Sequence, residues 1–364
     1  MWDVVIIRSN SLENDTRVFK ISKSLSKRYL VSALGWNREG RNTDHSGIPV
    51  HRNVLGIRAP IGKPSLVLYY PLFWVWIFVH LVISRPKFVH ACDLDTALPA
   101  ILYKLIFRKK MIFDIFDRYA MAYIPQKYGF LYKIVNKFEE YIGTKSDALI
   151  TVGDQLLESL NAIPSIYDVI MNCPEDQFVE KEAKPGSYLT LVYTGNIVTD
   201  RGLEIISKAI QDLNGVKLIL AGRVLDNQLM EDLKKNKNII YKGVLSLEQA
   251  SKLESKADVM IIIYNPVNIL NRMAMPNKLF ISMMHGIPVI TNLAKEIIIE
   301  SNHGILVNYF DINEVQNAVV RLRDDDQFRC KLGQNGRNCF LQKYNWEVME
   351  NRLFKIYLAL KNHV

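Results

Sequence analysis

The segment NRMAMPNKLFISMMHGIPVITN, residues 271–292, predicts a loop, a helix, a helix stop and a buried strand in direct succession. Pro276 suits the first helical turn, where its missing N–H costs nothing. Gly286 suits a left-handed stop, and the apolar run 287–290 suits a strand buried on both faces. The apolar face of the helix repeats at helical spacing through Leu279, Phe280, Met283 and Met284.

A helix that begins at the edge of a parallel sheet is a ready site for phosphate. The net charge of +9 also favours anionic partners, which include nucleic acid, acidic lipid headgroups and phosphorylated substrates. No zinc-ligand spacing, ribonucleoprotein motif or dense basic run is present, so nucleic acid is not expected. A phosphorylated substrate or a membrane surface is the better prediction.

The length of 364 residues suggests two domains. The four cysteines, Cys92, Cys173, Cys330 and Cys339, are scattered without metal-ligand spacing, which favours reduced thiols and a cytoplasmic location. The first residues lead into a strand rather than a signal peptide.

Strand and helix patterns alternate along both halves of the chain, which is typical of doubly wound parallel sheets. The charged, breaker-rich run 180–187 is the predicted linker between domains 1–182 and 186–344, with a helix at 345–364 packing back onto the first domain. The loop after the first strand lacks G-x-G-x-x-G, so a dinucleotide cofactor is disfavoured. The predicted strands are 4–7, 29–34, 50–55, 88–91, 111–113, 148–152, 169–174, 188–193, 216–221, 239–241, 258–264, 287–290 and 304–307.

The most hydrophobic stretch is LVLYYPLFWVWIFVHLVI at 66–83. Its length approaches that of a membrane span, but Pro71 interrupts it and a strand pattern resumes at residue 88. Three interpretations stay open: a buried or surface-docked helix of the first domain, monotopic membrane contact, and a true span. Each leaves the catalytic parts in the cytoplasm.

Acidic residues follow two of the predicted strands. Asp93 and Asp95 come after the first, and Asp114 and Asp117 after the second. Ligands of open parallel sheets lie beyond the carboxyl ends of the strands, so these carboxylates are site candidates. Helix capping and loop solvation are the structural alternative.

The chain resembles the retaining glycosyltransferase family 4, of GT-B fold, over essentially its whole length. The segments that carry the resemblance are FVHACDLDTALPA (88–100), KKMIFDIFDRYA (109–120), YTGNIVTDRGLE (193–204) and MPNKLFISMMHGIPVI (275–290), with weaker support from NHGILV (302–307) and YNWE (344–347). The expected fold class is therefore α/β, with two Rossmann-like parallel-sheet domains that face a cleft.

The resemblance implies a nucleotide-sugar donor held by the second domain and an acceptor held by the first, with no metal or resident cofactor. Arg201 would stabilise the departing phosphate, and Asp117 would orient the acceptor hydroxyl. For Arg201 and Arg223, a solvated side chain or a structural ion pair is the alternative. The implied donor-binding residues are Gly195, Asn196, Arg201, Arg223, Gly243, Val244, Met275, Pro276, Asn277 and Lys278. The implied acceptor-side residues are Asn14, Asp93, Asp95 and Asp117.

The chain departs from the family at three positions. Met273 and Ile281 stand where many relatives carry a pair of glutamates, and Phe116 stands where a histidine is common. Apolar Ile281 cannot accept hydrogen bonds from a ribose. Backbone N–H groups and Arg201 would then carry more of the donor binding.

The predicted function is a retaining glycosyltransferase that moves a sugar from a nucleotide diphosphate to a cell-surface glycan or lipid-linked oligosaccharide precursor. It would act in the cytoplasm, with peripheral membrane contact as an option. The main alternative is a non-catalytic GT-B partner of an active transferase, and a GT-B epimerase or phosphorylase is the third.

Overall fold

A computed structural model describes residues 2–13, 15–40, 50–179 and 188–362. The chain divides into two compact units. The N-terminal unit comprises Met1–Asn172 and Met349–Val364, and the C-terminal unit comprises Cys173–Val348. The first boundary lies before the predicted one, because the chain from Cys173 onward already packs with the C-terminal unit. The predicted linker at 180–187 lies outside the described residues.

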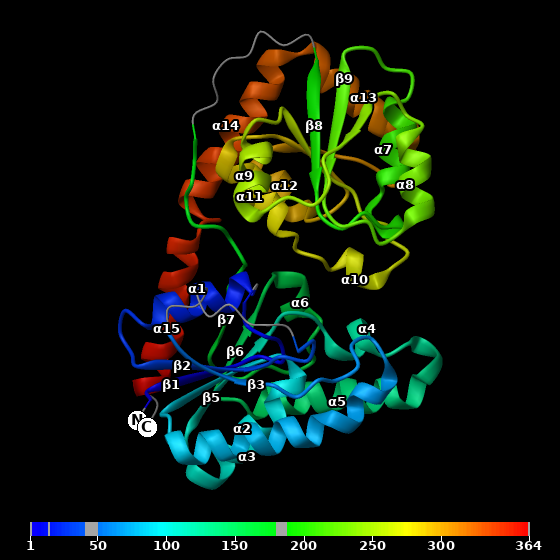
Figure 1. The fold of residues 1–364 in the computed structure, drawn as a ribbon. Coiled ribbons are helices and arrows are strands. Elements are labelled where there is room, and N and C mark those ends of the chain that lie inside the picture. Colours follow the sequence, from blue (N-terminus) through cyan, green and yellow to red (C-terminus); the bar gives the residue numbers. More distant parts are fainter. Residues whose placement is uncertain (1, 14, 41–49, 180–187, 363–364) are drawn as a thin grey trace. The chain divides into compact units, whose positions relative to one another are not determined.

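The N-terminal unit is built on a seven-stranded parallel sheet with strand order β3-β2-β1-β4-β5-β6-β7 (Figure 1). Its central strands are buried along their whole length, as expected when helices cover both faces. The strands are β1 (Val4–Ile7), β2 (Val31–Trp36), β3 (His51–Leu55), β4 (Phe88–Cys92), β5 (Lys110–Ile115), β6 (Ala148–Thr151) and β7 (Tyr167–Val169).

Helices cover both faces of this sheet. Figure 1 shows α2 (Tyr70–Ser84), α3 (Leu94–Phe107) and α5 (Gly129–Lys145) on one side, and α1 (Thr16–Leu25) and α15 (Trp346–Asn362) on the other. Tyr357 of α15 is fully buried, and its hydroxyl lies 2.9 Å from Nδ1 of His90 in β4. The last helix thus packs on the N-terminal sheet. Shorter elements are η1 (Pro64–Tyr69), α4 (Tyr119–Tyr123), η2 (Gln126–Tyr128) and α6 (Asp154–Glu158).

The C-terminal unit has a six-stranded parallel sheet with strand order β10-β9-β8-β11-β12-β13. Its strands are β8 (Leu189–Thr194), β9 (Val216–Ala221), β10 (Ile239–Tyr241), β11 (Val259–Ile262), β12 (Val289–Thr291) and β13 (Gly304–Leu306). Its helical elements are η3 (Thr199–Arg201), α7 (Leu203–Ile210), α8 (Asn227–Lys234), α9 (Leu247–Ser255), α10 (Ile269–Arg272), α11 (Asn277–His285), α12 (Lys295–Ser301), α13 (Ile312–Asp324) and α14 (Asp326–Gln342).

The predicted alternation of strands and helices is confirmed, with local differences. The strand predicted at 169–174 is instead Tyr167–Val169, and the second strand begins and ends two residues later than predicted. Pro276 is the N-cap of α11 rather than a residue of its first turn, since its ψ of 129° is extended. Gly286 ends α11 in the left-handed conformation, as expected.

The hydrophobic stretch at 66–83 forms η1 and α2. Pro71 does not interrupt the helix but stands in its first turn, where proline is tolerated. Only one face is buried, through Tyr70, Phe73, Ile77 and Leu81. Of the interpretations left open by the sequence, the helix thus agrees with one docked on the surface of the first domain rather than enclosed within it. By length and composition Pro64–Ser84 is apolar enough to cross a membrane, with 22% of it buried within the protein.

Candidate functional site

Backbone hydrogen bonds join three strand ends at the carboxyl edge of the C-terminal sheet. The N–H of Gly195, after β8, donates to the Ala221 carbonyl at 2.8 Å, and the N–H of Gly222, after β9, donates to the Gly243 carbonyl at 2.8 Å. A Cβ on Gly222 would lie only 1.8 Å from the Gly195 oxygen, and its φ is +142°. Glycine is therefore required where these loops touch.

Helix α11 begins beside this edge without a side-chain cap and without an acidic residue in its first turn. The N–H groups of its first residues, Asn277 and Lys278, have no partner within the helix. The Lys278 stem passes 3.5 Å from the point where a Cβ on Gly195 would lie. An uncapped helix start and an ammonium group therefore lie next to a glycine loop, which is an arrangement that suits an anion.

Two polar side chains hold the Lys278 ammonium. It donates to the Thr194 hydroxyl and lies 3.5 Å from a carboxylate oxygen of Glu254, a residue of α9 with only 4% exposure. Thr194 in turn donates to the same carboxylate. Burial lowers the pKa of Lys278, and the Glu254 charge opposes that shift. A bound phosphate would add a second negative charge beside the ammonium.

Arg201 ends η3 and is half-buried against neutral groups. It donates to the Asn271 side-chain oxygen at 3.2 Å, and its guanidinium lies 4.0 Å from the centre of the Tyr264 ring. Arg201 forms no ion pair among the described residues, so the structural ion pair that the sequence left open is absent there. The positive charge of Arg201 therefore has no carboxylate partner in this part of the chain.

The other predicted donor residues are less enclosed. Arg223 is exposed after Gly222, and Val244 is 70% exposed after Gly243. Asn196 is exposed, and its carbonyl accepts a hydrogen bond from the Tyr193 hydroxyl at 2.7 Å. Met275 is half-buried just before α11. Lys278 thus lies directly beside Gly195, and Gly222 links Gly195 to Gly243. Asn196 and Val244 are in the adjoining loops.

In the N-terminal unit, Asp93 and Asp95 lie at the carboxyl end of β4 and are buried. Asp93 accepts hydrogen bonds from the Arg8 guanidinium and from the Phe116 N–H at 2.8 Å. It has a φ of +65°, a strained conformation for aspartate, and it makes no side-chain cap bond. Burial raises the pKa of Asp93 to about 7, against the attraction of Arg8.

Asp95 faces a different set of groups. It accepts from the hydroxyls of Ser9 and Tyr70, and its other carboxylate oxygen is buried without a hydrogen-bond partner among the described residues. Burial raises its pKa despite Arg8. An unsatisfied buried carboxylate oxygen makes Asp95 the residue of this edge most ready to accept a further hydrogen bond.

Asp114 has a structural role that the sequence does not reveal. It lies within β5 and is fully buried, with Arg17 bound to both its oxygens at 2.7 and 3.1 Å and His90 at 3.2 Å. His90, Cys92 and Asp114 are close enough for a metal ion, but Arg17, His90 and Tyr357 already occupy the donor atoms of Asp114 and His90. We interpret this cluster as an internal ion-pair network.

Asp117 follows β5 and is exposed. It has no hydrogen bond or ion pair among the described residues. Partial desolvation raises its pKa more than Arg8 lowers it. The Phe116 ring lies under the Arg8 guanidinium, 4.1 Å from it. Asn14, the remaining acceptor-side prediction, lies outside the described residues.

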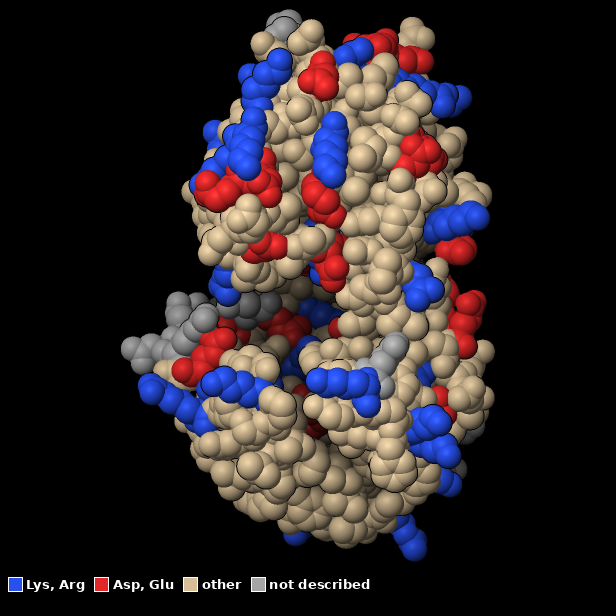
Figure 2. All heavy atoms as spheres, turned by 90° about the vertical axis from the view of Figure 1, so that its right-hand side faces the viewer, with Lys and Arg blue, Asp and Glu red and all other residues tan. Residues whose placement is uncertain are grey.

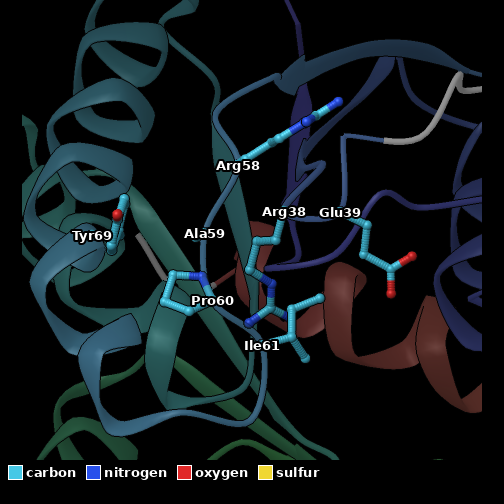
Figure 3. Close-up of a pocket in the computed structure, with 7 residues that line it drawn as sticks. All are labelled: Arg38, Glu39, Arg58, Ala59, Pro60, Ile61 and Tyr69. Atoms are coloured by element: carbon cyan, nitrogen blue, oxygen red, sulfur yellow. The ribbon is translucent and has the colours of Figure 1, made fainter.

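The loops after β2 and β3 form a pocket of about 600 Å³ in the N-terminal unit. It combines two guanidinium groups, Arg38 and Arg58, and the Glu39 carboxylate with apolar Ile61 and with Tyr69 of η1 (Figure 3). The Arg38 carbonyl accepts from the Ala59 N–H at 3.0 Å, which holds the two loops together. No motif pointed to this pocket in advance.

Comparisons with known proteins agree with this geometry. Residues 188–325 match the family described as Glycosyl transferases group 1. An uncharacterized glycosyltransferase of Methanocaldococcus jannaschii is 23% identical, covering 86% of each chain. Sucrose-phosphate synthase from Thermosynechococcus elongatus superposes with a TM-score of 0.80 at 16% identity, covering 99% of each chain. The fold is GT-B.

Anabaena HepE, whose structure was solved in complex with UDP and glucose, superposes with a TM-score of 0.73 at 13% identity, covering 99% of this chain and 100% of HepE. The expected GT-B fold class is thus confirmed. The matched segment contains Gly195, Arg201, Glu254 and Lys278, so the glycine loops and the start of α11 lie within the part of the chain that is similar to Glycosyl transferases group 1.

Proposed function

We propose that the protein is a retaining glycosyltransferase that uses a nucleotide-diphosphate sugar. The observation that carries the proposal is the uncapped start of α11, where Lys278 lies against the Gly195 loop within the segment that matches Glycosyl transferases group 1. Structural neighbours with the same fold, such as Anabaena HepE with UDP and glucose, support a nucleotide donor.

The diphosphate leaving group would be met by three sources of positive charge. The first N–H groups of α11 supply the positive end of the helix dipole, and Lys278 supplies an ammonium. Arg201 supplies a guanidinium that no carboxylate neutralises among the described residues. Stabilising the charge that develops on the departing phosphate is the largest catalytic contribution expected of such groups. Retention of configuration and metal independence rest on the family resemblance.

The acceptor would be a cell-surface glycan or a lipid-linked oligosaccharide precursor, held by the N-terminal unit. Asp117 is exposed and lacks a hydrogen-bond partner among the described residues, which suits it to orient an acceptor hydroxyl. The pocket of Arg38, Glu39, Arg58, Ile61 and Tyr69 offers two guanidinium groups against one carboxylate, beside apolar side chains. The two guanidinium groups would bind an acceptor that carries phosphate.

A direct test combines a thermal-shift screen against UDP, GDP, ADP and CDP with turnover assays on the matching nucleotide-sugars. We expect one nucleotide to raise the melting temperature and one of its sugars to be hydrolysed or transferred. Arg201→Ala should lower turnover by about 10²- to 10³-fold. As a control, Arg321→Ala removes an arginine that stacks on Phe328 in α13 and α14, and it should leave turnover unchanged. Neither a shift nor turnover with any donor would contradict the proposal.

One observation favours a second candidate, a non-catalytic GT-B partner of an active transferase. Met273 and Ile281 occupy the positions at which many relatives of the resembled family carry glutamates, and both are half-buried. A nucleotide-induced shift without turnover, together with co-purification of an active transferase, would favour this candidate.

A further inference from the structure

The outer side of α2 is apolar along its whole length. Its solvent-facing positions, Leu72, Val75, Val79 and Ile83, are 50%, 62%, 46% and 75% exposed and follow helical spacing. The opposite side packs on the sheet through fully buried residues, including Phe73, Ile77 and Leu81. A surface helix ordinarily turns polar side chains to water. Helix α2 differs, because it is apolar on both sides.

The neighbouring helices extend the same surface. Helix α3 packs against both α2 and α5 on one side of the sheet (Figure 1). Exposed apolar side chains on α3 are Leu102, Leu105, Ile106 and Phe107, and on α5 they are Phe130, Leu131, Ile134, Phe138 and Tyr141. We call this surface the α2–α3–α5 face. Single exposed apolar residues are common, but a face of three adjacent helices marks an interaction site.

The acidic side chains of these three helices all have hydrogen-bond donors within the N-terminal unit. Helix α2 contains no acidic residue, and the acids of the other two helices, Asp95, Glu139 and Glu140, all accept hydrogen bonds from within the unit. Glu139, for example, is fully buried and binds Arg118 at 2.8 Å. The face therefore presents no unpaired carboxylate.

Positive charge borders the face. Lys133 and Lys137 are exposed one turn apart on α5, and helical spacing places them along the edge of its apolar stripe. Exposed Arg85 ends α2, and exposed Arg108 ends α3. Figure 2 shows a wide tan surface at the lower end of the N-terminal unit, with Lys and Arg side chains near its margin.

We propose that the α2–α3–α5 face docks on the surface of a bilayer that contains anionic lipids. An apolar helix face with basic residues at its border is the combination that binds in the interface between headgroups and acyl chains. The exposed side chains of α2, α3 and α5 would enter the upper acyl region, and the bordering Lys and Arg would contact lipid phosphates. This inference goes beyond the proposed transfer reaction and does not depend on it.

The topology argues against a transmembrane helix. Helix α2 connects β3 to β4 in one sheet, and Phe73, Ile77 and Leu81 are fully buried. Crossing a bilayer would remove these side chains from the core, at about 1.5–3 kcal/mol for each.

The charge pattern also argues against a second copy of the chain as the occupant. A two-fold interface places the same patch on both partners. The basic borders would then face each other with no unpaired acid on the same face to neutralise them. An anionic lipid surface complements both the apolar stripe and its border.

Co-flotation of the full chain with phosphatidylcholine vesicles, with and without phosphatidylglycerol, tests the proposal. We expect flotation with the anionic vesicles and weaker flotation without them. The double variant Val75→Asp/Val79→Asp should weaken anionic-vesicle binding by about tenfold or more, because it places two charges in the apolar stripe. The matched control is Ile299→Asp, which charges a 63% exposed apolar residue of α12 in the C-terminal unit and should bind vesicles as the wild type does.

The charge-reversal variant Lys133→Glu/Lys137→Glu should lose the preference for phosphatidylglycerol. Equal flotation of wild type and Val75→Asp/Val79→Asp would overturn the proposal, as would a failure of the wild type to float. So would a dimer in light scattering that the same double variant dissociates. Nucleotide-induced thermal shifts, measured in parallel, should be identical in all variants, which separates this result from any failure of the proposed function.

Discussion

The carboxyl edges of the two parallel sheets carry opposite arrangements of charge. In the N-terminal unit the two guanidinium groups beside β4 and β5 are neutralised: Arg8 binds Asp93, and Arg17 binds Asp114 through both oxygens. Arg38 and Arg58 line the separate pocket of the loops after β2 and β3. In the C-terminal unit Arg201 contacts only Asn271 and Tyr264 among the described residues, both of them neutral. Lys278 has one carboxylate, Glu254, at 3.5 Å.

This difference indicates which edge can receive the diphosphate of the donor. A guanidinium that already binds two carboxylate oxygens has little left to offer a phosphate, whereas one that contacts neutral groups keeps its charge available. The two sheets share a layout of parallel strands, so the layout alone does not assign the roles. The roles are instead assigned by the partners of four cations, Arg8, Arg17, Arg201 and Lys278. Each of these contacts can be altered separately.

The largest effect should come from the N-terminal edge, as a loss of stability without a loss of nucleotide binding. Asp114→Asn leaves the buried Arg17 charge without its carboxylate, which should cost about 3–5 kcal/mol of unfolding free energy. Chemical denaturation with urea measures it. Asp232→Asn, which removes a pair at the surface of α8, is the matched control and should leave unfolding unchanged. An unfolding free energy of Asp114→Asn equal to that of the wild type would show that the Arg17–Asp114 pair does not stabilise this edge.

At the C-terminal edge, Lys278→Met should weaken binding of the preferred nucleoside diphosphate by about 10- to 100-fold, because a charge-assisted hydrogen bond to phosphate is lost. Calorimetric titration gives the affinity. Lys331→Met, at an exposed position of α14, provides the control. An unchanged affinity in Lys278→Met would remove this residue from the donor site.

The smallest effect concerns pH. The pKa of Asp93 is about 7 in the folded protein and 3.8 when unperturbed, so the folded state binds this proton more tightly. The stability that it contributes is present at low pH and is lost as the pH rises from about 4 through 7. Urea unfolding at pH 5 and pH 8 should show this decline in the wild type and a smaller one in Asp93→Asn. Equal declines would mean that Asp93 titrates normally.

The fold was predictable because its signals are local. Alternating strand and helix patterns indicated both sheets, and Gly286 marked the end of α11 before β12. The prediction failed at Pro276 by one residue, since proline suits both the cap and the first turn.

The side-chain partners were not predictable, because they depend on packing between distant elements. In the sequence, Glu254 is one of several charged residues of amphipathic α9. In the structure it is buried against Thr194 and Lys278. Arg17 likewise reads as an outward residue of α1, and only the sheet brings it to Asp114. The outer face of α2 could not be assigned either, since an apolar sequence does not say which sides are covered.

Amide hydrogen exchange with and without the preferred nucleoside diphosphate tests most directly the claim that only the C-terminal edge receives the donor. The account predicts slower exchange at Asn277 and Lys278 and in the loop from Gly195 to Arg201, with little change at Asp93–Asp95 and Phe116–Asp117. Protection at the N-terminal edge, with none at the start of α11, would contradict it.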